Sequence, residues 1–409
     1  MLRSIKLSGV VLFAILLLGC SGGNGVKEVK RLAFDSQQRQ LSANCNDFSF
    51  NLLNTVAEGD QSANIIVSPL SASMLLGMVM NGADGNTLAQ MRLTLGFGDE
   101  FSTETVNDYY RQLIDALPAL DRTNKVMIAN SMWVQDGFDL LASFTDVNHD
   151  YFYAKTDNVD FHNPKTADKI NKWASDNTKG LIKEVVKADE IADMMAVLAN
   201  ALYFKGIWDE QFEKTDTRNK DFTTAAGQTG KVPTMHLTKE LFYTDTEEGQ
   251  LLQMDYKEHQ YCMDIYLPAK GVDLRESLRG LTSEVWGQWL ENMREYEVSV
   301  ALPKFECRYN SEFNKPLQQM GITDAFSAFA NFSRMSSTPL YLSLVKQFCY
   351  MKVDEEGTEA AAVTWAGVEK CSAPPPLEHR DFIADHPFAV FIREKQFGTI
   401  LFTAIVGNP

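Results

Sequence analysis

The sequence lacks the short motifs that mark most enzyme active sites. It contains neither G-x-S-x-G nor H-E-x-x-H, and no glycine-rich phosphate-binding loop occurs in its 409 residues. The six histidines are dispersed without metal-ligand spacing. The triplet His379-Arg380-Asp381 imitates a kinase catalytic loop, but its glycine-rich and D-F-G partners are missing. We therefore expect no enzyme, no metal and no cofactor, while a triad assembled from distant residues stays open.

Cysteine is scarce and is not arranged in pairs. Beyond Cys20, the chain has five scattered cysteines with no C-x-x-C spacing: Cys45, Cys262, Cys307, Cys349 and Cys371. Neither a zinc site nor a disulfide framework is expected from this odd, dispersed set. Cys262 and Cys349 lie in apolar, strand-like runs, which predicts that both are small core residues.

Basic residues are fewer than acidic ones, with 38 Lys and Arg against 54 Asp and Glu, for a net charge of -16. An acidic surface repels phosphate backbones, so nucleic acid is excluded as a partner. The hydrophobic content of 45% and the charged content of 22% are those of a globular chain with a large core. One or two domains are expected from this length.

Long apolar runs are also missing, and the one near the N-terminus, from Val10 to Leu18, is too short to span a bilayer comfortably. Arg3 and Lys6 precede it, as in a signal peptide. The following Leu-Leu-Gly-Cys resembles a bacterial lipoprotein processing site. Residues 1–19 are thus predicted to be a signal peptide, and Cys20 to carry the lipid that anchors an exported protein to the cell envelope, facing the periplasm or the extracellular space. A plain secretory signal with an incidental cysteine is the alternative.

Residues 20–43 begin with a Ser-Gly-Gly-Asn-Gly stretch and predict a flexible tether, followed by one large domain at 44–409. Apolar spacing predicts helices from Asn46 to Val56, Leu70 to Met91 and Ala167 to Thr178. Strands are predicted from Lys125 to Val134, Met194 to Phe204, Tyr261 to Leu267, Glu297 to Phe305, and Phe388 to Val406. Because helices and strands mix without a regular βαβ rhythm, the fold class is α+β.

The most informative segment runs from Val353 to Thr364. By helix propensity it would be a turn and a short alanine-rich helix. However, it follows a strand-like run and precedes a polar stretch with three consecutive prolines, which predicts a long exposed loop. Every second residue is small, namely Thr358, Ala360, Ala362, Thr364 and Ala366. In a strand these residues share one face, so the segment could slide between two existing strands without clashing with the core.

This segment resembles the hinge of the serpin family in its inhibitory form, and the similarity extends over 44–409. The matching stretches are N-I-I-V-S-P-L-S (64–71), N-S-M-W-V (130–134), I-N-K-W (170–173), T-K-G (178–180), N-A-L-Y-F-K-G-I-W (200–208), L-P-K-F (302–305), D-A-F (324–326), H-P-F (386–388) and I-L-F (400–402). The resemblance implies three β-sheets, eight or nine helices, and an exposed reactive-centre loop at about 355–385.

The resemblance also implies a mechanism. A protease cuts the loop as a substrate, and the freed hinge then inserts into the central sheet and traps the acyl-enzyme. The hinge residues are Glu356, Gly357, Thr358, Glu359, Ala360, Ala361, Ala362, Val363 and Thr364. The implied cluster that controls sheet opening is Ser68, Ser71, Asn200, Gln347 and Trp208, with Gln347 where the family commonly has histidine. The implied scissile bond is Cys371–Ser372, with Lys370 as the alternative cleavage residue.

The implied partner is a serine or cysteine protease that meets a monomeric inhibitor. Two other functions compete with inhibition. The first is a serpin fold that no longer inhibits and acts as a binding protein, and the second is a hydrolase or solute-binding lipoprotein. Non-inhibitory members tend to have charged residues, bulky residues or proline on the inserting face, and none occurs between Thr358 and Ala366. A convergent polar site, which the second alternative needs, is not visible in the sequence.

Overall fold

A computed structural model describes residues 30–358 and 376–409. The predicted signal peptide, Cys20, the hinge from Glu359 onward and the predicted scissile residues Lys370, Cys371 and Ser372 lie outside the described residues.

The described chain forms ten α-helices, against the eight or nine expected, and three of them are no longer than six residues. The helices are α1 (Ser36–Gly59), α2 (Pro69–Met80), α3 (Gly85–Thr94), α4 (Thr103–Ala116), α5 (Ala142–Phe152), α6 (Lys165–Asn177), α7 (Ala188–Ile191), α8 (Leu274–Arg279), α9 (Ser283–Asn292) and α10 (Asn314–Gln319). Short 3₁₀ turns are η1 (Leu117–Ala119), η2 (Lys214–Asp216), η3 (Lys257–His259) and η4 (Asp324–Phe326).

The strands agree with most of the predicted ones, with two differences. The predicted strand from Glu297 to Phe305 is two strands that part at Lys304, and the run from Phe388 to Val406 is a hairpin. The strands are β1 (Asn64–Val67), β2 (Lys125–Gln135), β3 (Lys155–Val159), β4 (Ala196–Ile207), β5 (Arg218–Thr223), β6 (Thr229–Asp245), β7 (Gly249–Asp255), β8 (Tyr261–Pro268), β9 (Arg294–Pro303), β10 (Phe305–Glu312), β11 (Leu344–Asp354), β12 (Gly357–Thr358), β13 (His379–Ile383), β14 (Phe388–Glu394) and β15 (Ile400–Val406).

These strands form two hydrogen-bonded sheets among the described residues. The six-stranded sheet has the order β10-β11-β12-β4-β2-β3, and the nine-stranded sheet has the order β1-β15-β14-β8-β7-β6-β9-β13, with β5 paired to β6. The third sheet that was expected is continuous with the second through β6, whose 17 residues pair with β5, β9 and β7 in turn. The α+β fold class is confirmed.

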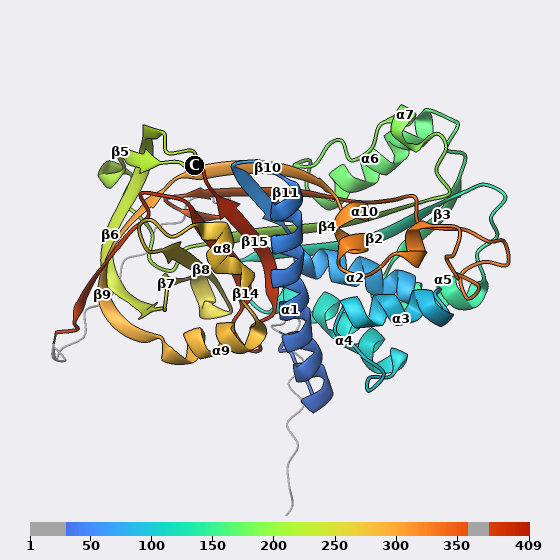
Figure 1. Cartoon of the computed structure of the whole chain (residues 1–409), viewed down its shortest axis with the longest axis horizontal. Coiled ribbons are helices and arrows are strands. Elements are labelled where there is room, and N and C mark those ends of the chain that lie inside the picture. The colour runs from blue at the N-terminus through green and yellow to red at the C-terminus, as the bar shows by residue number, and fades with distance from the viewer. Residues whose placement is uncertain (1–29, 359–375) are drawn as a thin grey trace, which may run out of the picture.

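The six-stranded sheet runs along the long axis of the molecule, with α6 and α7 on one side of it and α1 to α5 on the other (Figure 1). All of α2 is buried beneath this sheet, as expected for a helix that is apolar all round. Ser68 caps α2 and Pro69 occupies its first turn. In the described part of the chain, no helix is long and apolar enough to cross a membrane.

The domain begins earlier than the sequence predicted, so the predicted tether is wrong for residues 30–43. Helix α1 starts at Ser36 because Asp35 and Gln38 form a reciprocal capping box. Before it, Leu32 and Phe34 are each 3% exposed. The Phe34 ring stacks on Phe397 at a centroid distance of 4.7 Å, so this segment is part of the core.

Replacing Phe34 by Ala is therefore expected to lower the free energy of unfolding by about 3–5 kcal/mol, because a buried aromatic ring is lost and a cavity remains. Phe34→Leu is the matched control and retains most of the buried apolar area. Chemical denaturation of the three proteins measures the difference. An unchanged midpoint for Phe34→Ala would show that residues 30–35 do not belong to the folded domain.

Candidate functional site

The centre of the six-stranded sheet is a seam between β4 and β11. These parallel strands pair with each other only at Leu344↔Val197 and Val345↔Leu198. At the opposite end of the seam, the two residues of β12 lie between them and pair with both. Between these points, Ala199–Lys205 and Lys346–Lys352 are not paired with one another. The outer edge of β4 is paired with β2 from Ala196 to Lys205, and that of β11 with β10 from Lys346 to Val353, so along these stretches the free backbone edges of both strands face the seam.

Strand β12 consists of the first hinge residues. Gly357 has φ of +152°, and a Cβ there would lie 2.0 Å from the carbonyl oxygen of Gly206, so only glycine fits so close to β4. Thr358 is 3% exposed, and its hydroxyl shares a 2.6 Å hydrogen bond with the hydroxyl of Tyr256. The side chain of Thr358 thus points into the core.

Trp208 lies at this hinge end of the seam, which corrects its grouping with the other four residues predicted to control sheet opening. Eight strand residues, or about 26 Å, separate it from Asn200. Its indole N–H donates to the carbonyl of Asp354 at 3.0 Å, its backbone N–H donates to Glu356 at 3.0 Å, and its ring stacks on Tyr256. Trp208 therefore fixes the chain immediately before Gly357.

Two glutamates fix the same short turn. The carboxylate of Glu355 is 6% exposed, accepts hydrogen bonds from Lys304 Nζ at 2.8 and 3.0 Å, and accepts another from Thr217 at 2.7 Å. Burial alone would raise the pKa of Glu355, but these hydrogen bonds outweigh it and hold the pKa below its ordinary value. Glu356 pairs with Lys214, whose side chain is 68% exposed.

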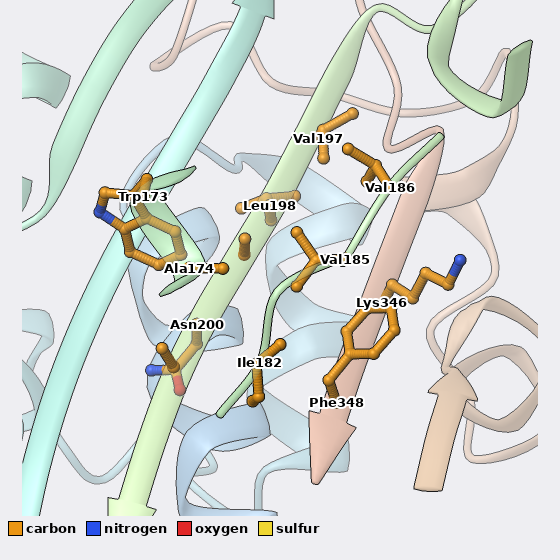
Figure 2. Close-up of a pocket in the computed structure, with 12 residues that line it drawn as sticks. Trp173, Ala174, Ile182, Val185, Val186, Val197, Leu198, Asn200, Lys346 and Phe348 are labelled. Carbon is orange, nitrogen blue, oxygen red and sulfur yellow. The ribbon is translucent and has the colours of Figure 1, made fainter. Parts of the chain in front are cut away.

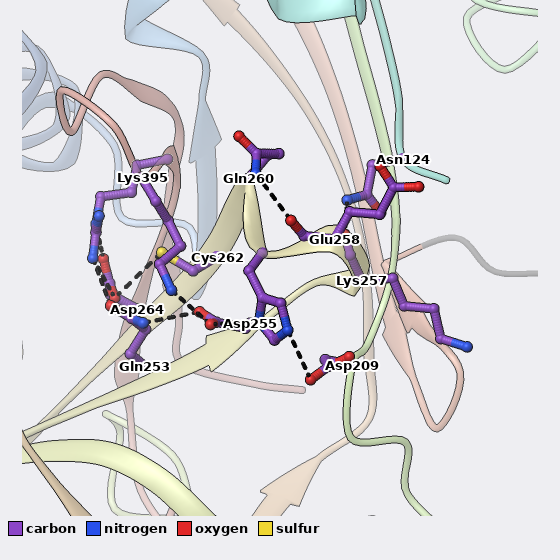
Figure 3. Close-up of polar contacts among 12 residues, drawn as sticks. Asn124, Asp209, Gln253, Asp255, Lys257, Glu258, Gln260, Cys262, Asp264 and Lys395 are labelled. Carbon is purple, nitrogen blue, oxygen red and sulfur yellow. Dashed lines mark hydrogen bonds and ion pairs between the residues drawn. The ribbon is translucent and has the colours of Figure 1, made fainter. Parts of the chain in front are cut away.

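A polar network joins Asp255, the residue before Tyr256, to Asp209, the residue after Trp208 (Figure 3). The imidazole of His259 lies between Asp255 and Asp209, at 3.1 and 3.5 Å, and so links the turn after β7 to the end of β4. The backbone N–H of Asp209 also donates to the carbonyl of Asp255 at 3.0 Å. Because Tyr256 follows Asp255 and Trp208 precedes Asp209, this network positions both aromatic rings against the hinge.

Deeper in the same network, a buried ion pair links β8 to β14 (Figure 3). The guanidinium of Arg393 donates to Asp264 at 2.5 Å and to Gln253 at 2.7 Å, and all three side chains are buried. Burial raises the pKa of Asp264 in spite of this partner.

The middle of the seam is held from below by the start of α2. Gln347 on β11 accepts a hydrogen bond from the Ser68 backbone N–H and donates one to the Ser68 carbonyl, both at 2.8 Å. The thiol of Cys349 donates to the same Gln347 oxygen at 3.3 Å. The glutamine thus uses its donor and its acceptor at once.

One turn later, Ser71 donates a hydrogen bond to the side chain of Asn200 on β4. Asn200 in turn donates to Asn130 on β2 at 2.5 Å, and Asn130 donates to the carbonyl of Phe152 at 3.0 Å. Four of the five residues predicted to form the sheet-opening cluster therefore meet at the N-terminus of α2. One side of the seam is attached to Ser68 and the other side to Ser71.

Helix α6 and the segment that follows it cover the outer face of the seam. A small pocket lies there, with Val197, Leu198 and Asn200 from β4 on one side and Lys346 and Phe348 from β11 on the other. Ile182, Val185 and Val186, from the segment after α6, lie between the two strands in this view, and Trp173 and Ala174 come from α6 itself (Figure 2). A strand that entered the seam would pass under this cover.

Comparison with known proteins identifies the family of this chain. The family model described as "Serpin (serine protease inhibitor)" matches residues 43–409. The chain belongs to the serpin family. Serpin B6 of Pongo abelii is 34% identical over 373 residues, which are 88% of this chain and 97% of that protein.

Solved structures agree with the assignment. The native state of tengpin, a thermophilic serpin, aligns with a TM-score of 0.83 and 30% identity over 94% of this chain and 98% of that one. Human thyroxine-binding globulin, solved in a complex with thyroxine, aligns with a TM-score of 0.83 and 26% identity, covering 91% of this chain and 100% of that one. This serpin is thus similar both to tengpin and to a thyroxine-binding protein.

Three important residues of this serpin's site were not predicted. Asn130 is the first residue of the matching stretch 130–134. Its pairing with Asn200 could have been predicted if the register of β2 against β4 had been known. Tyr256 and Lys304 reach the hinge from distant parts of the chain; no local pattern marks Tyr256, and Lys304 stood in the matching stretch 302–305 without an assigned role. Within the described residues, no group of three metal-binding side chains is arranged to hold a metal ion.

We expect Gln347→Met to destabilise the native state by about 1–3 kcal/mol, because the buried Ser68 N–H loses its acceptor. The Ser68 carbonyl keeps a second donor, the N–H of Ala72 at 3.1 Å, so the groups that lose a partner are the Ser68 N–H and the weakly donating Cys349 thiol. Lys352→Met, on the outward face of the same strand, is the control, and its partly exposed ion pair contributes less than about 1 kcal/mol. Guanidinium denaturation at neutral pH distinguishes them, and equal midpoints would contradict the role of Gln347.

Acid should weaken the hinge anchor at Glu355. A carboxylate whose pKa is lowered by folding stabilises the folded state above its ordinary pKa, and this contribution disappears as pH falls through the folded value. Glu355→Gln should therefore cost about 1–2 kcal/mol at pH 7, and the cost should shrink below about pH 4.5. Glu356→Gln is the control and should cost less than about 1 kcal/mol, because its partner is exposed. A cost for Glu355→Gln that does not change between pH 7 and pH 3 would refute this explanation.

Proposed function

We propose that this serpin is a suicide-substrate inhibitor of serine endopeptidases, and that it also accepts cysteine proteases. The single observation that carries the proposal is the seam between β4 and β11, which two hinge residues have already entered at one end. A strand that continued from Thr358 would run antiparallel to both neighbours and complete their hydrogen bonding.

Extending the register of β12 supports the proposal. Thr358 is opposite Gly206 on β4 and Val353 on β11, and its side chain points into the core. In the same register the following core-facing residues are Ala360, Ala362, Thr364 and Ala366. All of them are small enough to pass over the packed residues below the seam.

The same register gives Thr364 a particular role. It would come to lie opposite Asn200 on one side and Gln347 on the other. These side chains belong to the two polar clusters that must separate when the seam widens. A threonine hydroxyl can both donate and accept, so it could replace hydrogen bonds that are lost at this point.

The inhibitory reaction then follows from the chemistry of peptide cleavage. The serine Oγ of the protease attacks the Cys371 carbonyl, the Cys371–Ser372 bond breaks, and the proton passes to the leaving amine of Ser372. Insertion of about fourteen residues carries the ester-linked protease about 45 Å before water can release it. Lys370 is the alternative cleavage residue for a trypsin-like enzyme, and mass spectrometry of the cut loop would identify the bond.

Thr358→Arg should convert the inhibitor into a substrate, because an unpaired charge cannot enter the buried position beside Tyr256. Mixed with a serine protease, the unmodified chain should give a complex that survives boiling in detergent, whereas Thr358→Arg should give mainly cleaved chain. Thr358→Ser keeps the hydroxyl and is the control. A stable complex formed equally by the arginine variant would refute insertion.

A non-inhibitory binding protein is the second candidate, since thyroxine-binding globulin shares the fold. The small core-facing residues of the hinge favour inhibition over this alternative. A panel of serine and cysteine proteases separates the two, because a binding protein would give cleavage without a trapped complex.

We also propose that this serpin is exported as a monomer and is anchored to the bacterial envelope by a lipid on Cys20. The proposal is supported by the basic start, the short apolar run and the Leu-Leu-Gly-Cys ending of residues 1–20. Mass spectrometry of the mature N-terminal peptide tests it.

A further inference from the structure

The chain enters the folded domain at a point fixed by several contacts. The backbone N–H of Lys30 donates to the carbonyl of Ala119 at 2.9 Å. The side chain of Gln396 donates to the carbonyl of Leu32 at 2.8 Å, and Phe34 is buried against Phe397. These contacts attach residues 30–35 to η1 and to the β14–β15 hairpin, so this point cannot move far without loss of buried surface.

This entry point lies on a long side of the molecule. The start of α1 is at the lower edge in Figure 1, between the two ends of the horizontal six-stranded sheet. Strands β4 and β11 run along that axis, so the hinge end of the seam and its opposite end lie on either side of the entry point. Helices α6 and α7 lie at the opposite edge.

Basic side chains surround the entry point although the whole chain has a net charge of -16. Lys30, Arg31, Arg39 and Arg122 are all exposed there. Two carboxylates beside them, Asp35 and Glu258, accept backbone hydrogen bonds and keep their negative charge, so the four basic side chains outnumber them. Asp35 caps α1, and Glu258 accepts the backbone N–H of Arg122. This face therefore complements an anionic surface, unlike the acidic chain as a whole.

We propose that this face, defined by Lys30, Arg31, Arg39 and Arg122, lies against the anionic lipid surface of the membrane, with the six-stranded sheet parallel to it. The proposal rests on the lipid at Cys20. Ten residues from Cys20 to Lys30 can span at most about 35 Å, whatever their conformation. A domain of this size is about 50–55 Å across, so the opposite edge cannot turn toward the bilayer.

This orientation has a consequence for inhibition. A protease carried from the hinge end of the seam to its opposite end would move parallel to the membrane. It would meet neither the lipid surface nor the anchor along that path.

The test uses the full lipidated chain on vesicles with about 30% anionic lipid. A fluorophore is attached at Arg122→Cys, or at Lys183→Cys between α6 and α7, in a Cys371→Ser background. The cysteines of the described domain are buried and would not react. A paramagnetic headgroup label should quench the fluorophore at position 122 at least threefold more than the one at position 183.

Three controls test whether the orientation depends on the lipid, on the short linker and on the basic side chains. The chain that starts at Ser21 without lipid should show no quenching at either position. A twenty-residue Gly-Ser insertion after Gly25 should reduce the difference between the two positions. Lys30→Gln, Arg31→Gln and Arg39→Gln together should lower quenching at position 122 toward its value on neutral vesicles.

Equal quenching at the two positions, or a mature chain without lipid on Cys20, would overturn the proposal. Either result leaves the inhibitory function intact if the soluble chain still traps a protease. Conversely, a chain that fails to trap proteases but shows the expected quenching would refute only the inhibitory function.

Discussion

The structure depends on a sheet whose two central strands, β4 and β11, are not paired with each other along most of their length. Strands β4 and β11 meet directly at only two residue pairs, and β12 occupies the opposite end of the seam between them. Beneath the seam, both strands are bonded to the start of α2, because Ser68 binds β11 through Gln347 and Ser71 binds β4 through Asn200. The N-terminus of α2 thus connects the two sides of the seam.

The two sides of the seam are attached with different strengths. Gln347 makes two buried hydrogen bonds to the backbone of Ser68, whereas Asn200 receives one from Ser71. Asn200 is also bonded to Asn130 on β2, and β2 is paired with β4 along ten residues. Widening of the seam would therefore break the Ser71 contact first. Strands β2, β3 and β4 would move together, while β11 would stay with α2.

At the hinge end, a segment held by several hydrogen bonds is followed directly by a glycine with an unusual backbone conformation. Trp208 donates hydrogen bonds to the backbone carbonyls of Asp354 and Glu356. Lys304 forms an ion pair with the carboxylate of Glu355. Gly357 follows directly and adopts a conformation that other residues rarely reach. Any strand that enters the seam must therefore pivot at this glycine, and the Tyr256 hydroxyl already binds the residue after it.

The sequence drew attention to Gly357 and Thr358 and to Ser68 and Ser71 because each pair lies in a short distinctive stretch. Local patterns could not predict that Tyr256 or Lys304 contacts the hinge, since both lie at strand ends far away in the sequence. The start of α1 was missed for a similar reason, because Leu32 and Phe34 are buried against a hairpin more than 350 residues away. Trp208 was grouped with Asn200 through the family resemblance, but the eight residues between them span about 26 Å in an extended strand.

The middle of the seam is held by an amide, Gln347, whereas its hinge end is held by a carboxylate, Glu355. Only the carboxylate can be protonated by acid. Gln347 stands at a position where the serpin family commonly has histidine. An amide does not titrate, and here both of its polar atoms are already bound to Ser68. Glu355 does titrate, and its bonds to Lys304 and Thr217 require the charged form. Acidification should therefore weaken the anchor of Glu355 at the hinge end, while the bonds between Gln347 and Ser68 in the middle of the seam stay unchanged.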